Sequence, residues 1–151
     1  MLSRFGQFSS VIFSLWRDIQ KIERDEMIKF GYKGAYAQYL VVLSQHPDGL
    51  VASKIGELCD KDKAAVSRVL GEMQENGLVM RENEGDRVYR GRIKLTDEGI
   101  RVADYICDKA RAAVAAVGRE MSEEERVLFY ETLERIASVL QELARDGIPQ
   151  E

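Results

Sequence analysis

The chain has 151 residues, of which 32% are charged and 45% are hydrophobic. This composition is typical of a folded, helix-rich globular domain and excludes a disordered chain. The net charge of −4 argues against a surface that is basic throughout, although residues 54–94, with nine basic and eight acidic side chains, are the least acidic part.

Several patterns that indicate other classes of protein are missing from the sequence. No apolar run approaches the roughly 20 residues that a membrane span needs, and the N-terminus lacks the continuous apolar core of a signal peptide. The two cysteines, Cys59 and Cys107, form no CxxC pair, which excludes a disulfide scaffold and a zinc pattern. We therefore expect a cytoplasmic protein with reduced thiols, no metal, no cofactor and no membrane partner.

The N-terminal part predicts two helices. Apolar residues at helical spacing predict a long amphipathic helix from about Ser3 to Met27. A helix of this length cannot bury its apolar stripe on itself, so we expect it to pack on other helices, with a second chain as one source of them. A second helix is predicted from about Ala35 to Gln45, and the segment His46-Pro47-Asp48-Gly49 stops it.

The stretch Val51–Gly77 predicts two short helices joined by a tight polar turn. Asp62 can cap the second helix, and Gly77 suits its end because glycine tolerates a positive φ. One face of this helix is predicted to be apolar, through Val66, Val69, Leu70 and Met73. The other face is small and polar, a composition that suits DNA phosphates and base edges, and comprises Lys63, Ala64, Ala65, Ser67, Arg68 and Glu72.

After Gly77 the period changes to that of a hairpin. Leu78–Arg81 and Arg87–Leu95 predict two strands around a polar turn, and Thr96 caps a long helix that runs to about Glu120. Ser122 caps a final helix, with Glu125 completing a capping box. A helix pair followed by a two-stranded ribbon indicates a winged helix-turn-helix. The predicted fold class is mainly α with a small β-hairpin wing, a DNA-binding lobe and a helical dimerisation region.

The segment from Asp62 to Gly99 resembles the core of the MarR family of bacterial transcriptional regulators. The matching features are the D-K-x-x-V-S-R helix, the Gly77-Leu78-Val79 exit, and an Asp-Arg wing that closes on Leu95-Thr96. The order of the remaining helices extends the resemblance over nearly the whole chain. It implies a homodimer that regulates transcription, most often as a repressor, by binding a pseudo-palindromic site on double-stranded DNA. Residues 3–34 and 97–146 would form the dimerisation region, and residues 35–96 the winged helix-turn-helix lobe.

The resemblance also implies which residues contact DNA. The helix from Asp62 to Asn76 would enter the major groove and the wing would reach the flanking minor groove. Asp86-Arg87 lies further from Leu95-Thr96 than the family's usual Asp-x-Arg, so either Arg87 or Arg90 is the minor-groove residue, with Arg87 ranked first. The predicted DNA-binding residues are Lys61, Lys63, Ala64, Ala65, Ser67, Arg68, Arg87 and Arg90.

Family members often bind small aromatic or phenolic effectors in a crevice between the dimerisation helices and the DNA-binding lobe. The candidates here, which could equally be core residues, are Phe8, Ile12, Trp16, Tyr36, Tyr39 and His46. Two alternatives to a ligand-responsive regulator stay open: a protein-interaction module, and a redox switch through Cys59. Catalysis is not expected, because His46 is the only histidine and no nucleophile motif or phosphate loop accompanies it.

Overall fold

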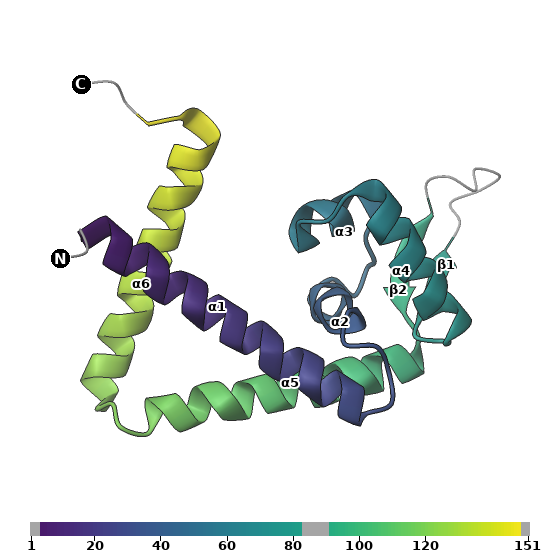
Figure 1. Cartoon of the computed structure of the whole chain (residues 1–151), viewed down its shortest axis with the longest axis horizontal. Coiled ribbons are helices and arrows are strands. Elements are labelled where there is room, and N and C mark those ends of the chain that lie inside the picture. Colours follow the sequence, from purple (N-terminus) through teal and green to yellow (C-terminus); the bar gives the residue numbers. More distant parts are fainter. Residues whose placement is uncertain (1–3, 83–90, 149–151) are drawn as a thin grey trace. The chain divides into compact units, whose positions relative to one another are not determined.

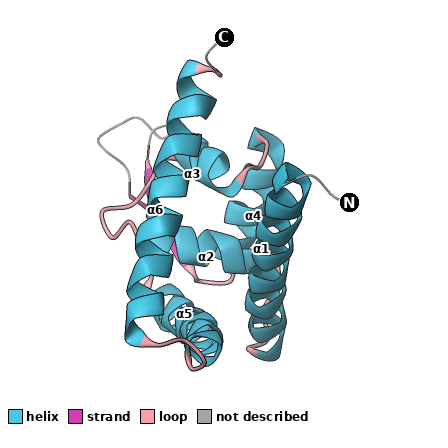
Figure 2. Ribbon diagram, turned by 90° about the vertical axis from the view of Figure 1, so that its left-hand side faces the viewer, coloured by secondary structure: helices cyan, strands magenta, loops and turns pink. Residues whose placement is uncertain are grey.

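The computed structural model describes residues 4–82 and 91–148, and helices dominate this part of the chain (Figures 1 and 2). The elements are α1 (Arg4–Lys29), α2 (Tyr36–Ser44), α3 (Ala52–Cys59), α4 (Lys63–Glu75), β1 (Val79–Glu82), β2 (Arg92–Leu95), α5 (Asp97–Gly118) and α6 (Glu123–Asp146). The predicted fold class, mainly helical with one small hairpin, is confirmed. The predicted wing residues Arg87 and Arg90 lie outside the described residues. No helix within the described ranges is long and apolar enough to cross a membrane.

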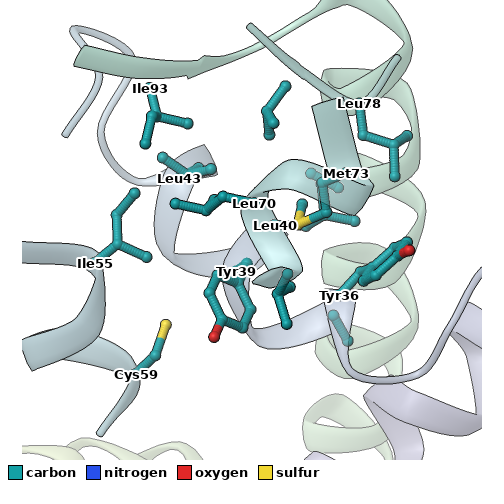
Figure 3. Packing of buried hydrophobic residues seen from close by; sticks show 14 of the residues in the cluster. Tyr36, Tyr39, Leu40, Leu43, Ile55, Cys59, Leu70, Met73, Leu78 and Ile93 are labelled. Atoms are coloured by element: carbon teal, nitrogen blue, oxygen red, sulfur yellow. The ribbon is translucent and has the colours of Figure 1, made fainter. Parts of the chain in front are cut away.

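The chain divides into two compact units, Met1–Arg111 and Ala112–Glu151. The core lies in the first unit, where α1, α2, α3, α4, the hairpin and the start of α5 each contribute buried side chains (Figure 3). The apolar stripe predicted for the second helix of the pair is confirmed, because Val66, Val69, Leu70 and Met73 are all buried. Each large apolar side chain buried in this way stabilises the fold by roughly 1.5–3 kcal/mol.

Short-range capping starts the helices where the sequence predicts. Asp62 Oδ1 accepts a hydrogen bond from the Ala65 backbone N–H at 2.8 Å, which satisfies a free donor in the first turn of α4. Thr96 Oγ1 accepts from the Gly99 N–H at 3.0 Å at the start of α5. Ser122 and Glu125 form the predicted capping box of α6.

The turn between α3 and α4 is short because its backbone folds back on α3. Asp60 adopts a left-handed conformation with φ 52°, and the Lys61 N–H donates to the Gly56 carbonyl at 2.9 Å. A Cβ at Gly56 would lie 3.0 Å from the Lys61 carbonyl, so only glycine allows the approach without adjustment. This turn therefore fixes the place at which α4 begins.

The wing strands are antiparallel, with Val79 opposite Leu95 and Glu82 opposite Arg92. Figure 1 shows the two strands beside α4. Leu50, just before α3, exchanges both backbone hydrogen bonds with Ile93, at 3.1 and 2.8 Å. The wing is thus tied to both ends of the helix pair, because β1 follows α4 and β2 pairs with the residue that leads into α3.

The second unit contains the end of α5 and the whole of α6. No residue of α6 is buried, and its apolar side chains are largely exposed, as is much of the apolar stripe on α1 in the first unit. Exposed apolar residues on these helices include Phe8, Ile12, Trp16, Ile19, Leu128, Leu133 and Leu140.

Candidate nucleic-acid interface

Helix α4 presents an exposed row of small and polar residues beside its buried stripe. Residues three and four apart share a face of an α-helix, so Ala64, Ser67 and Arg68 form one exposed row. Ala65, Arg68 and Val69 form the next row by the same spacing. Arg68 therefore stands where the two rows meet, with its side chain exposed.

Three cations around the start of α4 make no side-chain bond to any residue that the structure describes, unlike Lys54 and Arg92 of the same lobe. Within the described residues, the side chains of Lys61, Lys63 and Arg68 make no hydrogen bond or ion pair. By contrast, Lys54 Nζ pairs with Glu57 at 2.6 Å, and Arg92 Nη1 donates to the Gly49 carbonyl at 3.0 Å. A small surface with unpaired cations can approach a polyanion and pair with its phosphates.

The other end of α4 is held by a hydrogen-bond cluster that the sequence pattern does not reveal. Glu72, predicted on the outward face, is half-buried, and its Oε2 accepts from Lys33 Nζ at 2.9 Å and Tyr36 Oη at 3.1 Å. Both hydrogen bonds hold the pKa of Glu72 below its usual range, and the bond from Lys33 has the larger effect on this pKa. Asn76 Nδ2 donates to the Glu72 carbonyl at 2.7 Å. The cluster orients α4 against α2 and the segment before it.

A cavity of about 260 Å³ lies in the first unit between α1, α2 and the start of α4. Tyr39 is the one residue of the six predicted to bind an effector that lines it. The remaining lining residues, drawn from α1, the segment before α2, α2 itself, the α3–α4 turn and α4, are Gln20, Glu23, Arg24, Gly34, Ala35, Ala37, Gln38, Lys61, Ala65, Arg68 and Val69.

The other five predicted effector residues lie elsewhere. Phe8, Ile12 and Trp16 lie exposed along α1, with Trp16 53% exposed. Tyr36 is buried in the core, where its hydroxyl bonds to Glu72. His46 Nδ1 donates to the Val42 carbonyl at 2.8 Å and so closes the end of α2. The structure therefore brings none of these five to the cavity beside α4.

Cys59 lacks the environment of a reactive cysteine. Cys59 is buried at the end of α3, and this burial raises the pKa of its thiol to about 11. A peroxide-sensing cysteine needs an accessible thiolate at neutral pH, so Cys59 has the opposite properties. Cys107 is half-buried, with its sulfur 3.9 Å from Ser44 Oγ. Within residues 4–82 and 91–148, no group of three or more metal-ligating side chains is close enough to hold a metal ion.

Comparison with known proteins agrees with this architecture. Residues 30–87 match the sequence model of the MarR family. A MarR-family transcriptional regulator from Silicibacter pomeroyi is similar, with 25% identity, coverage of 97% of this chain and 94% of that chain, and a TM-score of 0.73. A putative MarR-family regulator from Listeria monocytogenes, solved with a 26mer DNA, has 16% identity, coverage of 100% and 99%, and a TM-score of 0.76.

A third similar structure is MepR, a transcription regulator of the Staphylococcus aureus multidrug efflux pump MepA. It has 20% identity, coverage of 88% of this chain and 98% of that chain, and a TM-score of 0.67. No curated protein sequence matches the chain. Residues 30–87 thus match the MarR family, and the fold of the described residues is similar to that of solved MarR-family transcriptional regulators.

Proposed function

We propose that the chain regulates transcription by binding a specific sequence of double-stranded DNA with helix α4. The observation that carries the proposal is the exposed surface formed by Lys61, Lys63, Ala64, Ser67 and Arg68, whose three cations bond to no side chain or backbone group in the described part of the chain. Such a surface fits the major groove, where an arginine or lysine can pair with guanine and an alanine can contact a thymine methyl. The Listeria monocytogenes protein, which has a similar fold, was solved in complex with a 26mer DNA, and this supports DNA binding by the present chain.

The regulator acts as a homodimer in this proposal. Support comes from the exposed apolar side chains of α1 and, in the second unit, of α6, since apolar surface of this extent usually marks an interface. Residues 3–34 and 97–146 would form the dimer, and residues 35–96 the DNA-binding lobe. Two copies of α4 would then bind two half-sites of a pseudo-palindrome, one helical turn of DNA apart.

We further propose that the regulator is a cytoplasmic repressor, and that a small effector relieves the repression. A ligand that favours a dimer with the wrong separation of its two α4 helices would weaken binding to both half-sites at once. Of the six residues predicted to bind the effector, Tyr39 is the first candidate, because it lines the cavity beside α4.

Selection of bound DNA from a random pool, repeated at two salt concentrations, tests the proposal. We expect an enriched inverted repeat and an affinity that falls steeply with salt, because released counterions drive phosphate binding. Sedimentation of the free protein should give twice the chain mass of 17.2 kDa. No enriched sequence would contradict DNA binding and would favour the alternative, in which the winged helix binds another protein.

A further inference from the structure

Arg68, the exposed arginine of α4, has an acidic neighbour on its own helix. The residues three and four positions away from it are Ala64, Ala65, Gly71 and Glu72. Side chains at these spacings lie on the same face of an α-helix, where opposite charges attract each other. Within α4, Glu72 is therefore the carboxylate that can compete with DNA for the Arg68 guanidinium.

Glu72 bonds to other groups in the structure. Its Oε2 accepts a hydrogen bond from Lys33 Nζ at 2.9 Å and another from the buried Tyr36 hydroxyl at 3.1 Å. Lys33 lies between α1 and α2, and Tyr36 is the first residue of α2. The pKa of Glu72 is lowered mainly by the Lys33 bond and next by the Tyr36 bond, whereas the charge of Arg68 has a smaller effect. Arg68 itself makes no hydrogen bond or ion pair within the described residues.

Lys33 is the donor that decides which way the carboxylate turns, because it carries a positive charge. A hydrogen bond between charged groups is roughly twice as strong as one between neutral groups. Without Lys33, Glu72 would keep only the neutral Tyr36 hydroxyl, and Arg68 would be the cation four residues away on the same helix. A guanidinium offers a carboxylate two parallel hydrogen bonds, so an Arg68–Glu72 pair would then be favoured.

We infer that Lys33 is a positioning residue for DNA binding, because it holds the Glu72 carboxylate toward α2 and so keeps Arg68 free for DNA. Lys33 lies outside the helix pair and outside the residues predicted to contact DNA. An arginine paired with a carboxylate on its own helix has fewer donors left for guanine and less net charge for phosphate. The DNA half of this inference rests on the proposed function, whereas the competition of Lys33 and Arg68 for Glu72 does not.

Fluorescence anisotropy of the full chain with the selected DNA tests the DNA half. Lys33→Gln should weaken binding by about fivefold or more, because the Arg68 contact is lost with it. Lys33→Arg keeps a charged donor and should retain most of the wild-type affinity. The matched control is Lys29→Gln, since the Lys29 side chain is 66% exposed against 65% for Lys33, and it pairs with Glu26 of its own helix at 2.6 Å. This control should bind DNA as the wild type does.

The decisive comparison repeats Lys33→Gln in a Glu72→Gln background, which has no carboxylate at position 72 to capture Arg68. Lys33→Gln should have no further effect on affinity in that background. A lysine that itself contacts phosphate would instead lower the affinity by the same factor in both backgrounds, and would reduce the slope of log affinity against log salt by about one. That result would overturn the inference, as would wild-type affinity in Lys33→Gln.

An NMR titration of the Glu72 carboxyl, in the full chain without DNA, tests the competition itself. In the wild-type background, Arg68→Gln should change the pKa of Glu72 little, because the Lys33 and Tyr36 bonds dominate it. In the Lys33→Gln background, Arg68→Gln should raise the pKa of Glu72 further, because Arg68 has become the partner of the carboxylate. An equal change of this pKa in both backgrounds would overturn the competition.

Thermal melting of each variant separates a lost contact from a lost fold, and Lys33→Gln suits the test because Lys33 is exposed. If no DNA sequence is selected at all, the proposed function fails and the DNA half of the inference fails with it. The carboxyl titration then still decides whether Lys33 keeps Glu72 from Arg68.

Discussion

The hydroxyl of Tyr36 donates a hydrogen bond to Glu72 at 3.1 Å and so ties a core residue of α2 to the predicted recognition helix. The bond joins the interior of the lobe, where Tyr36 is buried, to a carboxylate about one turn beyond Arg68 on α4. Lys33, from the segment after α1, bonds the same carboxylate at 2.9 Å. The angle at which α4 leaves the lobe therefore depends on residues far from its basic end.

Tyr36→Phe should remove this tie while keeping the ring in the core. We expect the free energy of unfolding in urea to fall by about 1 kcal/mol, the usual net worth of one hydrogen bond. Tyr130→Phe on α6 is the matched control, since Tyr130 is 46% exposed and its hydroxyl makes no bond within the described residues. An equal loss in both variants would show that the Glu72 bond contributes nothing.

Gly99→Ala should destabilise the lobe. A Cβ at Gly99 would lie 1.9 Å from the Leu78 carbonyl oxygen, so the start of α5 would have to move away from the wing. Overpacking of this kind costs about 1–3 kcal/mol. Gly71→Ala in α4 is the control, and it should raise the stability instead of lowering it, because nothing lies within 4 Å of a Cβ placed at Gly71. Helix propensity predicts a gain of about 0.5–1 kcal/mol there, measured in the same urea titration.

Asp62→Ala should loosen the first turn of α4. The variant removes the acceptor for the Ala65 N–H at 2.8 Å, and loss of an N-cap costs about 1 kcal/mol. Asp62→Asn keeps the acceptor and should stay within a few tenths of a kcal/mol of wild type in thermal melts. If the two variants are equally destabilised, the carboxylate acts through its charge rather than as a cap.

Arg68→Ala should weaken binding to the selected DNA by about 1–3 kcal/mol if the guanidinium contacts a base, and should relax the preference at that position. Lys54→Ala is the comparison, because Lys54 lies in the same lobe but pairs with Glu57 at 2.6 Å. Lys54→Ala should weaken DNA binding less than Arg68→Ala, and by the same factor for every DNA sequence. Unchanged affinity and specificity in Arg68→Ala, measured by anisotropy, would remove Arg68 from the interface.

Glu23→Gln should stabilise the protein in a pH-dependent way. Burial, partly offset by the neighbouring Arg24, raises the pKa of Glu23 above its ordinary value of 4.5. Between the unfolded and folded pKa values the folded state binds more protons, so stability falls as pH rises through that window. The variant should therefore melt higher than wild type near neutral pH and equally below pH 4.5, where Glu23 is protonated in both states. A difference that does not depend on pH would contradict this assignment.

The local features of the helix pair follow from the sequence. Asp62 caps α4, Gly77 follows α4 with φ +70°, and the stripe from Val66 to Met73 is buried, as periodicity predicts. These features depend on hydrogen bonds and side-chain rows that span three or four residues, so the order of residues is sufficient to locate them. The exposed basic row of α4 was predictable for the same reason.

Other features join residues that are distant in the chain, and periodicity carries no information about them. Glu72 has the spacing of an outward residue, yet Lys33 and Tyr36 draw it inward. Leu50 lies in the connection between two predicted helices, yet its backbone pairs with Ile93 of the wing.

The cavity depends on the same kind of long-range packing. Arg24 and Arg68 line one hollow, although each belongs to a helix whose own pattern places it on a plain polar face. The sequence by itself determined the helices, their caps and the basic row, because local bonding decides these. Only the tertiary structure decided that Arg68 also belongs to a cavity, because the distance between α1 and α4 is set by how the core between them packs.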